Sequence, residues 1–62
     1  MPRVDVPEED RRAAFAALVE AQDGGMTPQD SRAEACRRFG LTDGQLRRIE
    51  EEGLDKQWPP LG

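Results

Sequence analysis

Apolar side chains recur at helical spacing in three stretches of this chain. In the first stretch, Phe15, Leu18 and Val19 form one stripe. Recurrence at i, i+3 and i+4 is the pattern of an amphipathic helix, so a helix is predicted over about residues 7–22. Residues 23–25, Asp-Gly-Gly, follow the stripe and are typical of a helix end and a turn.

The start of this first helix is marked by a capping-box spacing. Asp5 and Glu8 stand three residues apart, as the capping and third helical residues of such a box do. Pro7 suits a first helical turn, where its missing N–H removes no hydrogen bond. We therefore expect Asp5 to cap a helix that begins near Pro7.

The second stretch predicts a helix over about residues 28–39. Thr27 is a favourable cap, Pro28 suits the first turn, and Asp30 stands at the box-like third position. Gly40 follows where a left-handed residue is needed, which glycine adopts without a Cβ clash. The residues expected to face inward are Ala35, Cys36 and Phe39.

The third stretch predicts a helix over about residues 43–57. Thr42 and Gln45 have the spacing of a capping box. Gly53 either ends this helix or lies inside it, at a cost of about 1 kcal/mol relative to alanine. The helix must stop before Pro59, because the residue before a proline disfavours helical geometry. The buried face is expected to contain Leu46 and Ile49.

Three helices in 62 residues predict an all-α fold, a small three-helix bundle. We expect one domain over residues 1–62, with a helix-turn-helix and a short extended tail at residues 58–62. A domain of this size buries only about 60% of the surface of its unfolded chain, which leaves no room for a deep pocket. The expected core consists of Phe15, Leu18, Val19, Ala35, Cys36, Phe39, Leu41, Leu46 and Ile49.

The amino-acid composition limits the kinds of functional site that the chain can form. The chain has no histidine and one cysteine, which excludes a disulfide framework and any metal site built from several such ligands. We expect no catalytic residues, no cofactor and no enzymatic activity, and a buried structural role for Cys36. The longest apolar run, Ala13 to Val19, is too short to span a membrane. A reducing, cytoplasmic location is expected.

The net charge is −4, which is unusual for a nucleic-acid-binding protein. The acidic excess lies in one half of the chain. Residues 1–31 carry three arginines against seven acidic residues, whereas residues 32–62 carry six basic residues against six acidic ones. The half that contains the expected helix-turn-helix is therefore neutral.

Residues 39–42, Phe-Gly-Leu-Thr, followed by residues 46–50, Leu-Arg-Arg-Ile-Glu, carry a family resemblance. The segment 32–55 resembles the promoter-binding helix-turn-helix in the C-terminal domain of bacterial sigma factors. In that family the element binds the upstream promoter hexamer and sits on RNA polymerase. The resemblance implies that Gln45, Arg47 and Arg48 lie at groove-facing positions.

Arginines supply most of the candidate contacts to double-stranded DNA. Arg47 and Arg48 could grip guanine or phosphate, since a bidentate contact to a base contributes about 1–3 kcal/mol of discrimination. The alternative is that they pair with Glu51 and Glu52 on a solvated face, for about 0.3–0.5 kcal/mol each. Phosphate contact or a solvated face explains Arg32 and the arginines of residues 37–38 equally well. The candidate DNA-binding residues are Thr42, Gln45, Arg47, Arg48, Arg37 and Arg38.

The C-terminal tail supports two interpretations. A tryptophan beside a stiff Pro-Pro pair is a suitable anchor for a partner protein, because little entropy is lost on binding. In the alternative, which we favour, Trp58 folds back to complete a small core. The candidate partner-binding residues are Trp58, Pro59, Pro60 and Leu61.

Two functions of different class follow. The first is a small DNA-binding or transcription-associated protein that contacts duplex DNA with its third helix. It would act as a homodimer or with a larger protein such as RNA polymerase, because one three-helix unit makes few phosphate contacts. The second is a protein-binding subunit that uses the scaffold and the tail to assemble into a larger complex. Neither involves a membrane.

Overall fold

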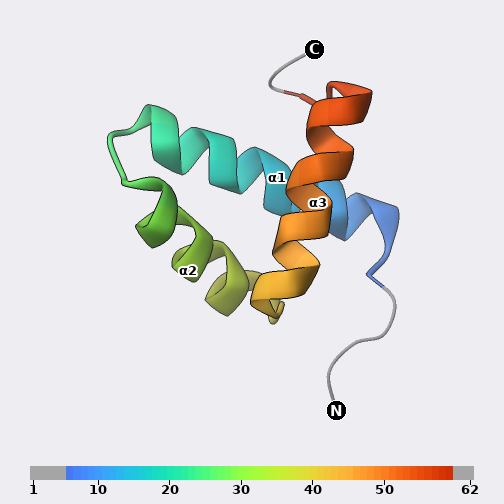
Figure 1. Cartoon of the computed structure of the whole chain (residues 1–62), viewed down its shortest axis with the longest axis horizontal. Coiled ribbons are helices and arrows are strands. Elements are labelled where there is room, and N and C mark those ends of the chain that lie inside the picture. Colours follow the sequence, from blue (N-terminus) through green and yellow to red (C-terminus); the bar gives the residue numbers. More distant parts are fainter. Residues whose placement is uncertain (1–5, 60–62) are drawn as a thin grey trace.

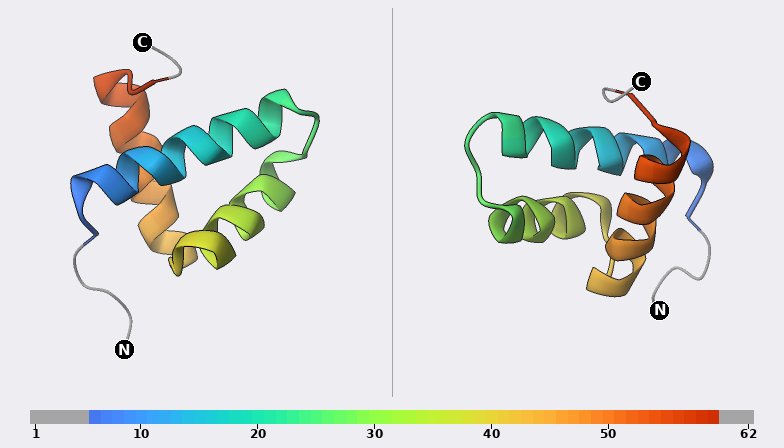
Figure 2. Two further views of the ribbon diagram at one scale, coloured as in Figure 1. Left: turned by 180° about the vertical axis from the view of Figure 1, so that it is seen from behind. Right: turned by 45° about the horizontal axis from the view of Figure 1, so that its top comes forward.

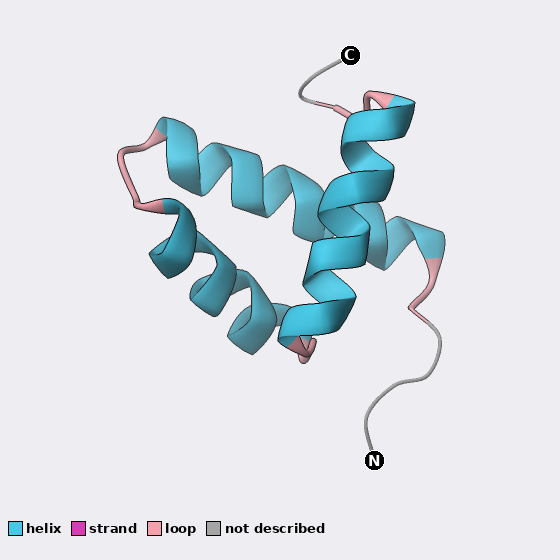
Figure 3. Cartoon of the chain, viewed as in Figure 1, coloured by secondary structure: helices cyan, strands magenta, loops and turns pink. Residues whose placement is uncertain are grey.

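A computed structural model describes residues 6–59, which form three helices and no strand. The helices are α1 (Glu8–Asp23), α2 (Pro28–Phe39) and α3 (Asp43–Lys56). Helix α1 leads into the loop and α2 leads back from it at an angle, so that the two form a V, and α3 crosses α1 steeply (Figures 1 and 2). All three pairs of helices pack against one another. The described chain is therefore an all-α three-helix bundle, as Figure 3 shows.

The helix bounds differ from the predicted ranges by at most one residue. The start of α1 differs in kind. Pro7 is the N-cap residue rather than the first helical residue, and no side chain caps the helix. The carbonyl of Pro7 accepts the first helical hydrogen bond from the N–H of Arg11 at 2.9 Å. Asp5, the expected cap, lies outside the described residues.

The N-terminal caps predicted for α2 and α3 are confirmed. The Thr27 hydroxyl accepts a hydrogen bond from the Asp30 N–H at 3.1 Å. Thr42 and Gln45 form a full capping box: the Thr42 Oγ1 accepts from the Gln45 N–H at 3.1 Å, and the Gln45 Oε1 accepts from the Thr42 N–H at 2.9 Å. Each cap satisfies backbone donors that a helix start otherwise leaves open.

All three helices end in the same motif. A residue with positive φ is followed by a residue whose N–H reaches the carbonyl five positions back, which is the Schellman arrangement. The positive-φ residues are Gly25, Gly40 and Gln57. The hydrogen bonds run from Met26 to Ala21 at 3.1 Å, from Leu41 to Cys36 at 2.9 Å and from Trp58 to Gly53 at 3.0 Å. Glycine fills two of these positions, as its freedom at positive φ favours.

Side chains from all three helices and from both flanking segments form one core. Its buried apolar members are Val6, Ala14, Phe15, Leu18, Ala35, Leu41, Leu46, Ile49 and Trp58. Six of the nine predicted core residues are among them. The other three, Val19, Cys36 and Phe39, are only partly buried at its edge. Phe39 is the last residue of α2, and the Arg38 guanidinium lies 5.7 Å from the centre of its ring.

Helices α1 and α3 approach most closely at Gly53, which lies inside α3 and is buried. A Cβ at this position would overlap the ring of Phe15. The ring of Trp58 then meets Phe15 edge to face, with centroids 6.1 Å apart. This contact confirms the interpretation in which Trp58 completes the core.

An ion-pair network links α1 and α3 beside this contact, and the Lys56 Nζ lies 5.8 Å from the centre of the Trp58 ring. The Glu52 carboxylate pairs with Arg11 of α1 at 2.9 Å and with Lys56 of α3 at 2.9 Å. Hydrogen bonds from Lys56 and from Arg11 lower the pKa of Glu52 below its ordinary value. The Arg11 guanidinium also donates to the carbonyl of Val6 at 2.6 Å, which ties the segment before α1 to the bundle.

Candidate nucleic-acid interface

Positive charge is concentrated around the turn between α2 and α3, residues 40–42, which we call the elbow. Residues 37–48 contain four arginines and one acidic residue, Asp43, whereas the other fifty residues contain five basic and twelve acidic residues. The net charge of −4 therefore hides a basic segment within an acidic chain. Such a segment is the electrostatic footprint expected of a surface that meets an anion.

The arginines of this segment are exposed and make no ion pair within residues 6–59. The predicted alternative for Arg48, a pair with Glu52, is wrong because Glu52 is held by Arg11 and Lys56. No pair between Arg47 and Glu51 forms within the described chain either. We define the elbow arginines as Arg37, Arg38, Arg47 and Arg48.

The remaining described basic residues are all engaged with carboxylates. Arg12 pairs with Glu8 at 3.3 Å, and Arg32 pairs with Glu50 at 3.2 Å. Arg11 and Lys56 share Glu52, as described above. Within residues 6–59, every basic side chain outside the elbow is therefore paired with a carboxylate.

The outer face of α3 changes sign along its length. Its inner face carries Leu46, Ile49 and Gly53, all buried. At 100° per residue, the exposed side chains opposite this face are those of Arg47 and Arg48 in the first half and those of Glu51 and Asp55 in the second. The outer face of α3 is therefore positively charged in its N-terminal half and negatively charged in its C-terminal half.

Two of the predicted contact residues have a structural task. Thr42 and Gln45 form the capping box of α3, with each side chain bonded to the backbone of the other residue. They hold the first turn of α3 at the elbow. Both side chains lie at the N-terminal end of α3, where the DNA contact was predicted, but the hydrogen bonds of the cap fix their conformations.

Arg37 and Arg38 lie in the last turn of α2, directly before the elbow. Positive charge is favourable there, because the C-terminal end of a helix carries partial negative charge. Together with Arg47 and Arg48 they place the elbow arginines on both helices that flank Gly40.

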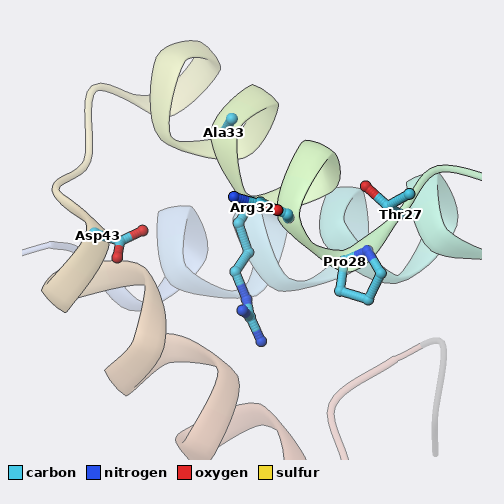
Figure 4. Close-up of a pocket in the computed structure, with 6 residues that line it drawn as sticks. Thr27, Pro28, Arg32, Ala33 and Asp43 are labelled. Carbon is cyan, nitrogen blue, oxygen red and sulfur yellow. The ribbon is translucent and has the colours of Figure 1, made fainter.

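A shallow surface hollow lies between α2 and the start of α3 (Figure 4). The Arg32 side chain extends across it toward α3, where it pairs with Glu50. The residues that line it are Thr27, Pro28, Gln29, Arg32, Ala33 and Asp43. Its single arginine is already neutralised, so the hollow adds no free positive charge to the elbow.

Cys36 is half-buried on α2 and lies within the influence of two acidic residues. Burial raises the pKa of its thiol, and the charges of Asp43 and Glu50 raise it further. A thiol with a raised pKa stays protonated at neutral pH and is a poor nucleophile. Within residues 6–59, no group of three potential metal ligands comes together.

Trp58, the first residue of the predicted partner-binding tail, is not available to a partner. Trp58 is only 3% exposed, so its ring is not presented at the surface. Pro59 is exposed, while Pro60 and Leu61 lie outside the described residues. Leu54 of α3 is the one exposed large apolar side chain of the described chain, beside an apolar hollow that Phe15, Leu18 and Val19 help to line.

Of the three described helices, none combines the length and the apolar composition needed to cross a membrane. Comparison of the chain with protein-family models, with curated proteins and with solved structures found no match.

Proposed function

We propose that this chain binds duplex DNA through the elbow arginines and the N-terminal half of α3. The observation that supports this proposal best is the uneven pairing of its basic residues. Arg11, Arg12, Arg32 and Lys56 all pair with carboxylates, whereas no elbow arginine has an ion pair within residues 6–59. Arg37 and Arg38 end α2, and Arg47 and Arg48 lie in the first half of α3, so the unpaired positive charge of residues 6–59 flanks one turn.

A DNA duplex fits this arrangement better than a small anion does. Helix-turn-helix proteins place the N-terminal residues of the second helix of the motif in the major groove, while the first helix crosses the backbone. Arg47 and Arg48 then face base edges or groove walls, and the arginines at the end of α2 reach phosphates. The steep crossing and the three-residue turn of α2 and α3 are consistent with this docking.

The acidic remainder of the chain limits how the duplex approaches. Glu51 and Asp55 would repel phosphates along the second half of α3, so the helix enters the groove only by its first two turns. Few phosphate contacts give weak binding by a single unit. We therefore infer that the chain acts as a homodimer or on a larger protein, and the sigma-factor resemblance favours a role in transcription.

The second interpretation, a protein-binding subunit, is weaker because its proposed anchor Trp58 lies in the core. Among the described residues, the exposed Leu54 is the large apolar side chain that remains for it. It becomes the preferred account if the chain does not bind DNA.

The test is fluorescence anisotropy of a labelled duplex titrated with the chain at low salt. We expect Arg47→Ala and Arg48→Ala each to weaken binding and to lower the salt slope by about 1 if the contact is to phosphate. Arg12→Ala is the matched control, because it removes the same charge from α1 and should bind as the wild type does. Absence of wild-type binding at low salt would overturn the proposal.

A further inference from the structure

Four of the five described glycines have a reason within the chain. Gly25 and Gly40 adopt positive φ, and Gly24 belongs to the same turn at the end of α1. Gly53 makes room for the ring of Phe15. Gly44 has no such reason. It lies in the first turn of α3, does not adopt positive φ, and a Cβ built on it meets no atom within 4 Å.

From helix propensity, this glycine is expected to be less favourable than alanine for the helix that carries it. A glycine in a helix loses more conformational freedom on folding than alanine does. Alanine would fit the open space at Gly44 without strain, so the fold alone favours a side chain at this position.

The position of Gly44 on α3 indicates a role for the absence of a side chain there. Residues three and four apart share a helix face, so Gly44 lies one turn before Arg47 and Arg48 on the outer face of α3. All three residues are exposed. Because helical side chains tilt toward the N-terminus, those of Arg47 and Arg48 extend on either side of the exposed backbone at Gly44.

We propose that Gly44 is the point at which α3 comes closest to a sugar–phosphate strand of the bound duplex. The absent side chain lets the strand approach the helix backbone, while Arg47 and Arg48 reach past it on either side. This inference rests on the proposed function, and it adds a residue whose role is to admit the ligand rather than to bond it.

The proposal predicts effects of opposite sign on folding and on binding. Gly44→Ala should raise the melting temperature by roughly 2–8 °C, because the helix loses less entropy on folding. The same variant should bind duplex at least about fivefold more weakly, which corresponds to about 1 kcal/mol. Gly44→Gln should bind more weakly still, since its side chain is longer.

The experiment measures thermal unfolding by circular dichroism and duplex affinity by anisotropy for both variants. Ala13→Gln is the control, since it adds a long side chain to an exposed position of α1 and should leave affinity unchanged. Wild-type affinity of Gly44→Ala, with weakened Arg47→Ala, would overturn this inference and leave the proposed function standing. A lowered melting temperature of Gly44→Ala would also overturn it, because the glycine would then serve the fold. If the wild type does not bind, both proposals fail.

Discussion

Both ends of α3 adjoin a turn with a positive-φ residue, but they differ in burial and in the pairing of their charged residues. At its N-terminal end, the chain turns through Gly40 into a capping box, and the arginines beyond it are exposed and unpaired within the described chain. At its C-terminal end, the chain turns through Gln57 and buries Trp58. The charged residues Glu52 and Lys56 are paired there.

This difference shows that in a very small domain one half of a helix can hold a neighbouring helix while the other half leaves its outer face exposed. The C-terminal half of α3 makes the contacts that hold α1, through Gly53, Trp58 and Glu52. The N-terminal half is held by its own cap and by Leu46 and Ile49, which are buried on its inner face. Its outer face is therefore free to meet a ligand without cost to the fold. Substitutions at the two ends should separate stability from binding.

The largest effect is expected from Trp58→Ala. Removing a buried aromatic ring that packs edge to face on Phe15 should lower the free energy of unfolding by about 3–5 kcal/mol. Chemical denaturation followed by circular dichroism measures this loss. Trp58→Phe, which keeps a ring, should lose less. An unchanged denaturation midpoint for Trp58→Ala would show that the tail does not close the core.

Gly53→Ala should cost roughly 1–3 kcal/mol, even though alanine is the better helix former. The added Cβ overlaps the buried Phe15 ring, so α1 and α3 must separate or the ring must move. A double-mutant cycle with Phe15→Leu tests the cause, because relief of the overlap should recover part of the loss. If the losses of stability of the two single variants simply add, the overlap with Phe15 is not the cause of the loss in Gly53→Ala.

Gln57→Gly should stabilise the chain by about 1 kcal/mol, because it removes a side chain from a left-handed backbone conformation. Gly40→Ala, at the equivalent position of the elbow, should cost a similar amount. Melting temperatures of the two variants measure both changes. Shifts of the same sign would contradict the equivalence of the two turns.

The smallest effect concerns pH. The pKa of Glu52 is lower in the folded chain than in the unfolded chain, chiefly through its hydrogen bonds with Lys56 and Arg11. Its contribution to stability is therefore present above the ordinary glutamate pKa and is lost as the pH falls through the lowered value. Glu52→Gln should flatten this acid limb in denaturation midpoints measured between about pH 6 and pH 2. If Glu52→Gln shows the same loss of stability at low pH as the wild type, other carboxylates are responsible for that loss.

Local signals in the sequence were enough to predict the three helices. Their apolar spacing and the caps at Thr27 and Thr42 depend on neighbours within one turn, and these elements agree with the structure. The start of α1 was predicted less well, because Pro7 is the N-cap residue. Tertiary facts were harder to foresee. Only the packing of α1 on α3 explains why Gly53 is buried, why Val6 joins the core and why Glu52 leaves Arg48 unpaired.

We propose that the ligand binds at the N-terminal end of α3, whereas Gly53, Trp58 and Glu52 at the C-terminal end hold α1. Backbone amide chemical shifts, followed by two-dimensional NMR during titration with an unlabelled duplex at low salt, test it most directly. We expect shifts concentrated in residues 37–48 and little change from Glu52 to Trp58. Shifts centred on the C-terminal half of α3 or on α1, or no shifts at all, would contradict it.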